Sequence, residues 1–206
     1  EVFSGLLAEQ PCKQFLPPKP EAPDHRLPLL KSRPSYLKEI LVFTALKMAG
    51  RKIIGVDAGY VNFAICGINT RDITRPYHWT NLPLFTGKFS EERLVHAVQE
   101  WIHRPDIQQL FNEADEIILE RQMTMKFQCI NHFIRANFFA KAREVNPNTV
   151  GAFFSLPIKD RKQKKKQAVD LVTSHTVFPV RKGKKDDLAD AYLLAFYGAI
   201  ESEPQL

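Results

Sequence analysis

The sequence predicts an α/β protein in which a mixed five-stranded sheet carries helices on both faces, after an N-terminal proline-rich arm and a helix. Two apolar runs, at about 52–58 and 61–69, are separated by a short turn that contains glycine, which is typical of an antiparallel hairpin. Beyond residue 90, helical patterns alternate with short apolar runs, as parallel strands with crossover helices require. Seven of the fourteen prolines lie within residues 1–34, and they exclude long helices there.

We expect two parts, an arm with a helix over residues 1–50 and one α/β domain over residues 51–206. Residues 35–48 repeat apolar side chains at helical spacing and are followed by Gly50, a residue that favours helix ends. The arm carries no recognisable motif. Its apolar side chains could pack on its own domain, but we favour an arm that reaches across a dimer partner. The chain does not begin with methionine, so we expect a processed or shortened product.

Strands are predicted where apolar runs are bounded by turns or by acidic residues. Helices are predicted where apolar residues recur three and four positions apart. The first three strands are expected to be antiparallel, before the alternation of helix and strand begins. The predicted strands are 52–58, 61–69, 77–84, 116–120 and 149–155. The predicted helices are 35–48, 90–103, 126–145, 161–174 and 186–200.

Three carboxylates lie in the first turns of the last predicted helix. Asp187 and Asp190 are three positions apart and Asp186 and Asp190 are four apart, so each pair shares one helix face. Like charges at such spacing repel one another unless a cation neutralises them or water solvates them. A divalent metal site is the functional interpretation. The alternative is a helix N-terminus that favours acidic residues, which accounts for Asp186 or Asp187 but explains Asp190 poorly.

Two of the predicted strands also end in an acidic residue. Asp57 closes the strand that precedes the glycine turn, and Glu120 closes the strand at 116–120. Either acid alone would usually mark only the point where a strand leaves the core. The order is more informative: a strand with Asp, a hairpin, a strand with Glu, and then a late helix with paired Asp.

Four motifs in this order resemble the RNase H-like nuclease superfamily. Within it they resemble the Holliday junction resolvases of the RuvC type, in particular the fungal mitochondrial and poxvirus branch of cruciform-cutting enzymes. The resemblance covers about residues 51–200 and leaves out the first fifty. The motifs are Gly55 to Gly59 (GVDAG) with Asn62 after it, Leu119 to Gln122 (LERQ), Asp160 to Lys162 (DRK) and Lys184 to Asp190 (KKDDLAD).

The resemblance implies an RNase H-like fold and four metal-binding acids, which would be Asp57, Glu120, Asp187 and Asp190. It also implies that Asp57 bridges two ions, while Asp186 would be a cap or an outer group. All four positions hold carboxylates, so nothing suggests an inactive site. Hard oxygen ligands favour Mg²⁺, with Mn²⁺ as a substitute. Two such ions support phosphodiester hydrolysis.

The charge distribution indicates a nucleic-acid partner. The net charge is +6, and the stretch from Lys159 to Lys185 holds ten basic residues against two acidic ones. A solvated surface or a targeting signal is the alternative, but these lysines oppose the helix dipole and lie beside the predicted acids. The resemblance implies that one lysine assists the reaction; we assign Lys162, with Lys165 or Lys166 as alternatives. The predicted DNA-binding residues are Arg121, Gln122, Arg161, Lys162, Lys164, Lys165, Lys166, Arg181, Lys182, Lys184 and Lys185.

The predicted helix at 126–145 has a wide apolar surface. The resemblance implies a homodimer built through this helix, and a two-fold dimer matches a substrate that must be cut twice. Buried packing within one chain is the alternative. Asn131, His132, Arg135 and Asn137 are interleaved polar residues that would contact DNA or face water. The apolar residues are Phe127, Ile130, Phe133, Ile134, Phe138 and Phe139.

We therefore expect a Mg²⁺-dependent endodeoxyribonuclease that resolves four-way DNA junctions by paired symmetric nicks. The alternatives are a catalytically silent relative that binds structured RNA or DNA, and an RNase H-type RNA nuclease. An actin-like phosphotransferase is disfavoured, because it needs a second domain that this chain is too short to hold. No apolar run could span a membrane. The expected location is the mitochondrion, with a large DNA virus as the alternative source.

Overall fold

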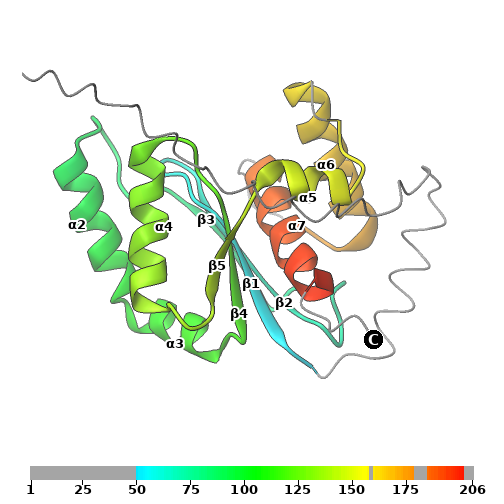
Figure 1. The fold of residues 1–206 in the computed structure, drawn as a ribbon, viewed down its shortest axis with the longest axis horizontal. Helices are drawn as coiled ribbons and strands as arrows, with labels where there is room; N and C mark the ends of the chain where they lie inside the picture. Colours follow the sequence, from blue (N-terminus) through cyan, green and yellow to red (C-terminus); the bar gives the residue numbers. More distant parts are fainter. Residues whose placement is uncertain (1–49, 158–159, 179–184, 202–206) are drawn as a thin grey trace, which may run out of the picture. The chain divides into compact units, whose positions relative to one another are not determined.

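A computed structural model of the chain describes residues 50–157, 160–178 and 185–201. The proline-rich arm, the helix predicted at 35–48, and the basic residues Lys159, Arg181, Lys182 and Lys184 lie outside this part. The described residues form a five-stranded sheet with helices on both faces, as the sequence predicts (Figure 1). None of the helices described is long and apolar enough to cross a membrane.

The sheet has the strand order β3-β2-β1-β4-β5, which confirms the predicted mixed sheet. β1 (Lys52–Asp57) pairs antiparallel with β2 (Phe63–Asn69), and β2 pairs antiparallel with β3 (His78–Leu82). On its other side, β1 pairs parallel with β4 (Glu116–Glu120), which pairs parallel with β5 (Ala142–Val145). β1 is therefore the central strand, and it is buried on both faces by alternating apolar side chains.

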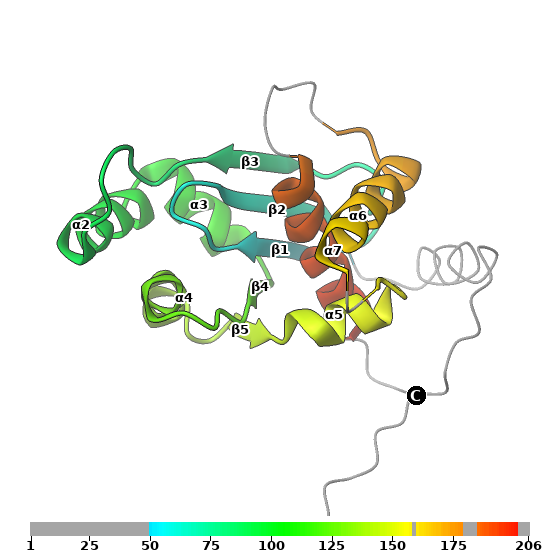
Figure 2. The same cartoon turned by 90° about the horizontal axis from the view of Figure 1, so that it is seen from above.

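One face of the sheet packs against α5 (Pro147–Phe153), α6 (Arg161–His175) and α7 (Lys185–Glu201). The other face packs against α2 (Glu91–Ile102), α3 (Pro105–Glu113) and α4 (Met125–Asn137). Neighbouring residues of β1 alternate between these two cores: Ile53 faces the first and Ile54 the second. Figure 2 shows α7 lying across the strands with α6 beside it.

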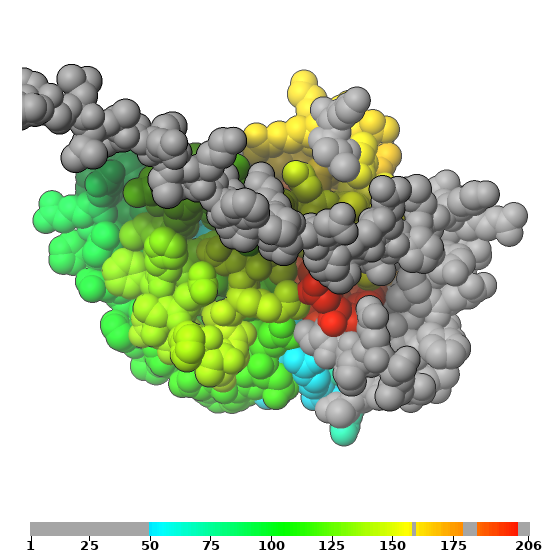
Figure 3. Space-filling view, viewed as in Figure 1, coloured from blue at the N-terminus to red at the C-terminus, as the bar shows by residue number. Residues whose placement is uncertain are grey.

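A glycine in β1 lets α7 approach the sheet closely. A Cβ atom added at Gly55 would overlap the carbonyl oxygen of Ala191 and the backbone nitrogen of Ala195. At the far end of α7, Arg143 of β5 forms an ion pair with Glu201 at 2.7 Å. In Figure 3 the red surface of α7 borders a yellow-green surface. The close approach sets α7 directly over the central strand.

The region between β4 and α6 differs from the prediction. The helix predicted at 126–145 ends at Asn137, and the following strand is β5 at 142–145 rather than at 149–155. Residues 147–153 instead form α5, because Asn146 caps the helix and Pro147 occupies its first turn. A short apolar run fits a buried helix as well as a buried strand, which explains the error. The helix α3 (Pro105–Glu113) was also not predicted from the sequence.

Candidate active site

Two carboxylates lie at the ends of adjacent parallel strands. Asp57 is the last residue of β1 and Glu120 is the last residue of β4. The register pairs Val56 with Leu119, so both strands end at the same edge of the sheet. Because β1 and β4 are parallel neighbours, their terminal acids come together at that edge, as the order of motifs predicts.

The first turns of α7 bring two more carboxylates to this edge. Asp187 is only 8% exposed, and Asp190 is partly buried one turn further along the helix. The approach of α7 at Gly55 places these turns beside the ends of β1 and β4. All four predicted acids line one cavity of about 650 Å³. Asp186 does not line it, and its carboxylate forms an ion pair with Lys165.

Burial and mutual repulsion change the titration of these acids. Burial raises the pKa of Asp57 well above its usual value, and the nearby charges of Glu120, Asp190 and Asp187 raise it further. Burial also raises the pKa of Glu120. The pKa of Asp190 rises to about 7, first through burial and then through the charge of Glu120. The cavity therefore holds acids that a nearby cation would stabilise in the ionised form.

The donor set fits a hard divalent cation in its chemistry, since it consists of carboxylate oxygens without thiol or imidazole. In the described part of the chain, however, no three His, Cys, Asp or Glu side chains stand close enough to hold one ion. The backbone thus positions four potential ligands around the cavity. To coordinate an ion together, their side chains would have to turn towards it.

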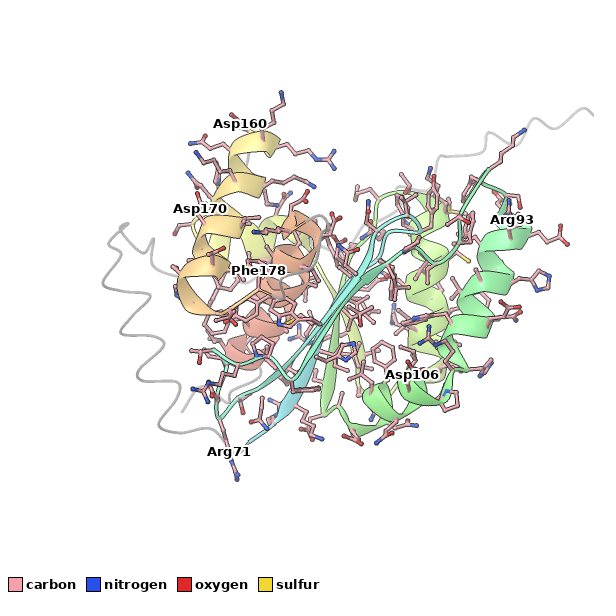
Figure 4. All side chains as sticks on the ribbon, turned by 180° about the vertical axis from the view of Figure 1, so that it is seen from behind. Arg71, Arg93, Asp106, Asp160, Asp170 and Phe178 are labelled. Carbon is pink, nitrogen blue, oxygen red and sulfur yellow. The ribbon has the colours of Figure 1, made fainter. Side chains whose placement is uncertain are left out.

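A basic wall from α6 borders the acids. Asp160 caps this helix by accepting hydrogen bonds from the backbone nitrogens of Lys162 (2.9 Å) and Gln163 (3.0 Å), and Figure 4 labels it at the helix end. The cap fixes where the helix begins, and Arg161, Lys164 and Lys165 of its first turns line the cavity.

Lys165 is the lysine of α6 that contacts the acids. Its ammonium group forms ion pairs with Asp186 and, at 3.9 Å, with Asp187. Burial lowers the pKa of Lys165, but the hydrogen bond to Asp186 and the neighbouring acids outweigh burial and raise it. Lys162 and Lys166 are exposed and do not line the cavity. The lysine in contact with the acids is thus Lys165, which we gave as an alternative to Lys162.

The other predicted DNA-binding residues that are described lie around the same edge. Gln122 lines the cavity, and Arg121 is exposed in the loop after β4, where its backbone nitrogen donates to the carbonyl of Val145 at 2.8 Å. Lys185 is exposed at the first residue of α7. Lys126 of α4 and Tyr60 of the β1–β2 turn also line the cavity, although no sequence pattern singled them out.

The surface of α4 differs from the expectation at one residue. Asn131 is 0% exposed, so the prediction that it contacts DNA or water is wrong. Its amide instead bonds within the protein. His132, Arg135 and Asn137 are exposed, as predicted. Among the apolar residues of the predicted helix, Ile130 and Ile134 are fully buried, whereas Phe139 just beyond α4 is 82% exposed. The homodimer through this helix stays a prediction.

Comparisons with known proteins agree with this architecture. A family model described as "Poxvirus A22 protein" matches residues 52–202. The yeast mitochondrial Holliday junction resolvase Ydc2 is 19% identical, with a TM-score of 0.51 over 77% of this chain and 82% of its own. Thermus thermophilus RuvC, in complex with a Holliday junction substrate, is 16% identical, with a TM-score of 0.47 over 72% of this chain and 92% of its own. No curated protein matches significantly. The similarity to Ydc2 shows the RNase H-like fold of the RuvC type.

Proposed function

Because the chain belongs to the poxvirus A22 protein family, we propose that it is a structure-selective endonuclease that resolves four-way DNA junctions by paired symmetric nicks. One observation carries this proposal: carboxylates from β1, β4 and α7 surround a single cavity that also has a basic wall from α6. Phosphodiester hydrolysis needs acidic ligands for cations and basic groups for the phosphate backbone, and the cavity offers both. The similarity in fold to Ydc2, a Holliday junction resolvase, supports a four-way junction as the substrate.

The proposed metal ligands are Asp57, Glu120, Asp187 and Asp190, with Mg²⁺ as the cation and Mn²⁺ as a substitute. When bound, two divalent cations supply an activated water and neutralise charge on the phosphate. Without them, Asp190 keeps its proton to a higher pH than an ordinary aspartate, since its pKa is about 7. Metal binding is therefore expected to release protons.

The basic residues of α6 have two roles in this proposal. Arg161 and Lys164 face the cavity and would bind phosphate oxygens of the DNA backbone. Lys165 holds Asp186 and Asp187 by ion pairs, and so fixes the first turn of α7 beside the other acids. Lys162 and Lys166 are exposed on the same helix, where they would reach the DNA further from the cavity. The resemblance implies an assisting lysine, which we assigned to Lys162; the ion pairs with the acids favour the alternative Lys165.

A homodimer would place two cavities on the two strands that must be cut. Support comes from around the start of α4, where Met123 is 85% exposed and Met125 is 83% exposed, and from Phe139, two residues beyond its end, which is 82% exposed. A group of exposed apolar side chains is typical of a contact surface, whereas a single one is common on any protein. For the source, the name of the family favours the large DNA virus over the mitochondrion that we predicted first.

One observation favours the alternative of a silent relative that binds structured DNA or RNA. The described side chains do not form a ready three-ligand site, and a protein that only binds would need none. A single experiment distinguishes the two functions, because a silent relative would bind the junction without cutting it. An RNase H-type nuclease would instead cut an RNA–DNA hybrid.

The test uses the purified chain with an end-labelled four-way DNA junction, a matching duplex and an RNA–DNA hybrid, each with Mg²⁺ and with EDTA. We expect paired symmetric nicks in the junction only, and only with Mg²⁺. Asp57→Asn serves as the control, which should bind the junction without cutting it. Tight binding by the unaltered chain without nicks would favour the silent relative, and cutting of the hybrid alone would favour the RNA nuclease.

A further inference from the structure

Lys126 of α4 lies over three aromatic rings at the edge of the cavity. Its Nζ atom is 5.5 Å from the ring centre of Tyr60, 5.2 Å from that of Phe89 and 5.3 Å from that of Phe127. The residue itself is exposed and lines the cavity. It belongs to the helical layer on the face of the sheet that α6 does not cover. The cavity therefore has a cation on each side of the sheet.

The three rings beneath Lys126 pack with Phe85 into one group, which we call the aromatic cluster: Tyr60, Phe85, Phe89 and Phe127. Tyr60 stacks on Phe85 with ring centres 5.4 Å apart and on Phe127 with ring centres 5.8 Å apart. The backbone carbonyl of Tyr60 accepts a hydrogen bond from Leu84 at 2.9 Å, which ties the β1–β2 turn to the loop after β3. Ring faces attract a cation, so the cluster restricts the positions that the ammonium group can take.

The charge of Lys126 is not neutralised by a carboxylate in the part of the chain that the structure describes. Lys165 on the other wall differs, because it is paired with Asp186 and Asp187. Asn62 and Gln122 line the cavity as well, and within the described residues their side-chain amides make no hydrogen bond. An unneutralised ammonium group and free amide donors are the groups that bind phosphate oxygens in nucleic-acid complexes.

We infer that Lys126, together with the amides of Asn62 and Gln122, forms a second phosphate-binding wall. A strand of nucleic acid would then lie across the cavity, held by Arg161 and Lys164 on one side and by Lys126 on the other. This path would bring the strand over the four acids. That the bound strand is then cut rests on the proposed function. The binding of phosphate by Lys126 does not require cutting.

A purely structural role for Lys126 is tested by a substitution that keeps its length and removes its charge. Lys126→Met would still cover the aromatic cluster, since a thioether packs well against rings. Lys126→Arg would keep the charge. Lys88→Met is the matched control, because Lys88 is also exposed and near the cluster but does not line the cavity.

The experiment measures the affinity of the unaltered chain and of these variants for a fluorescent duplex and a four-way junction, in EDTA, between about 50 and 200 mM salt. We expect Lys126→Met to lower affinity about eightfold near 0.1 M salt and to reduce the slope of log affinity against log salt by about 0.9, the value for one phosphate contact. Lys126→Arg should bind like the unaltered protein, and Lys88→Met should show the same slope. The melting temperatures of all variants should agree.

Two results would overturn the inference. One is an unchanged affinity and slope for Lys126→Met on both DNAs. The other is an equal loss in Lys126→Met and Lys126→Arg, which would assign the effect to packing. The proposed function fails separately: if the unaltered protein made no nicks in Mg²⁺ or bound the junction no better than the duplex, the salt slopes on the duplex would still decide the role of Lys126.

Discussion

The side-chain amide of Asn131 donates a hydrogen bond to the backbone carbonyl of Glu120 at 2.8 Å. The same Nδ2 atom donates to the carboxylate of Glu144 on β5 at 3.0 Å. Asn131 is fully buried on α4, next to the apolar Ile130 and Ile134. Burying an amide N–H group has a free-energy cost unless it is hydrogen-bonded, and the bond to Glu120 is made at the strand end that carries a proposed metal ligand. The helix proposed for dimerisation is thus connected directly to the candidate active site.

Replacing Asn131 with leucine should weaken both stability and cutting. The substitution leaves the carbonyl of Glu120 and the carboxylate of Glu144, both partly buried, without this donor, and we expect a loss of roughly 2 kcal/mol in the free energy of unfolding. Displacement of Glu120 should lower kcat for nicking more than it raises KM. Asn137→Ala on the exposed face of the same helix is the control and should change neither quantity measurably. A normal kcat in Asn131→Leu would contradict the positioning of Glu120 by this residue.

Gly55→Ala should separate α7 from β1. The added methyl group would overlap the backbone of Ala191 and Ala195, which cannot give way as a side chain can. We expect a loss of about 1–3 kcal/mol in unfolding free energy, measured by urea denaturation, together with loss of nicking, because Asp187 and Asp190 move with the helix.

Gly151→Ala provides the comparison for this substitution. There the added Cβ atom would lie 3.4 Å from Lys164 Cε, an ordinary contact with a flexible side chain, so stability should be retained. Equal stability of the two variants would show that α7 does not depend on the close approach at Gly55.

Asp57→Asn should stabilise the metal-free protein while it abolishes cutting. Burial and three neighbouring acids raise the pKa of Asp57, so its ionised form is unfavourable in the folded state. Removing that charge should raise the melting temperature in EDTA at about pH 8, where the carboxylate costs most. Asp170→Asn, on an exposed position of α6, should leave the melting temperature unchanged. A lower melting temperature for Asp57→Asn would show that the acids do not repel one another.

The stability of the metal-free protein should fall as the pH rises through the range in which Asp190 titrates. Its pKa is about 7 in the folded protein against an ordinary value of 3.8. Between these values the unfolded chain is ionised while the folded protein still holds the proton, so rising pH favours unfolding until about pH 7. Denaturation in EDTA at about pH 5 and about pH 8 should show this loss, and Asp190→Asn should reduce it. If the stability of Asp190→Asn and of the unaltered protein changed equally with pH, the raised pKa of Asp190 would be contradicted.

Local patterns in the chain were enough to predict the central part of the fold and the acids. Apolar runs that end in Asp57 and Glu120, and the helical spacing of Asp187 and Asp190, depend only on residues close together in the sequence. Strand pairing follows from them, because two short strands joined by a tight turn form a hairpin and the next buried strand adds in parallel. The same patterns failed at 149–155, where an apolar run fits either a strand or a helix.

Contacts between distant segments set the rest. Lys162 and Lys165 occupy the same helix, but the packing of α6 beside α7 turns Lys165 towards the acids and leaves Lys162 exposed. Lys126 lies at the candidate site because α4 and the β1–β2 turn meet in the aromatic cluster. Asn131 is buried where α4 packs on β4 and β5, and there it donates to Glu120 and Glu144. A spacing pattern records which residues share a face of one element. Which element packs against that face depends on contacts between residues that are far apart in the sequence.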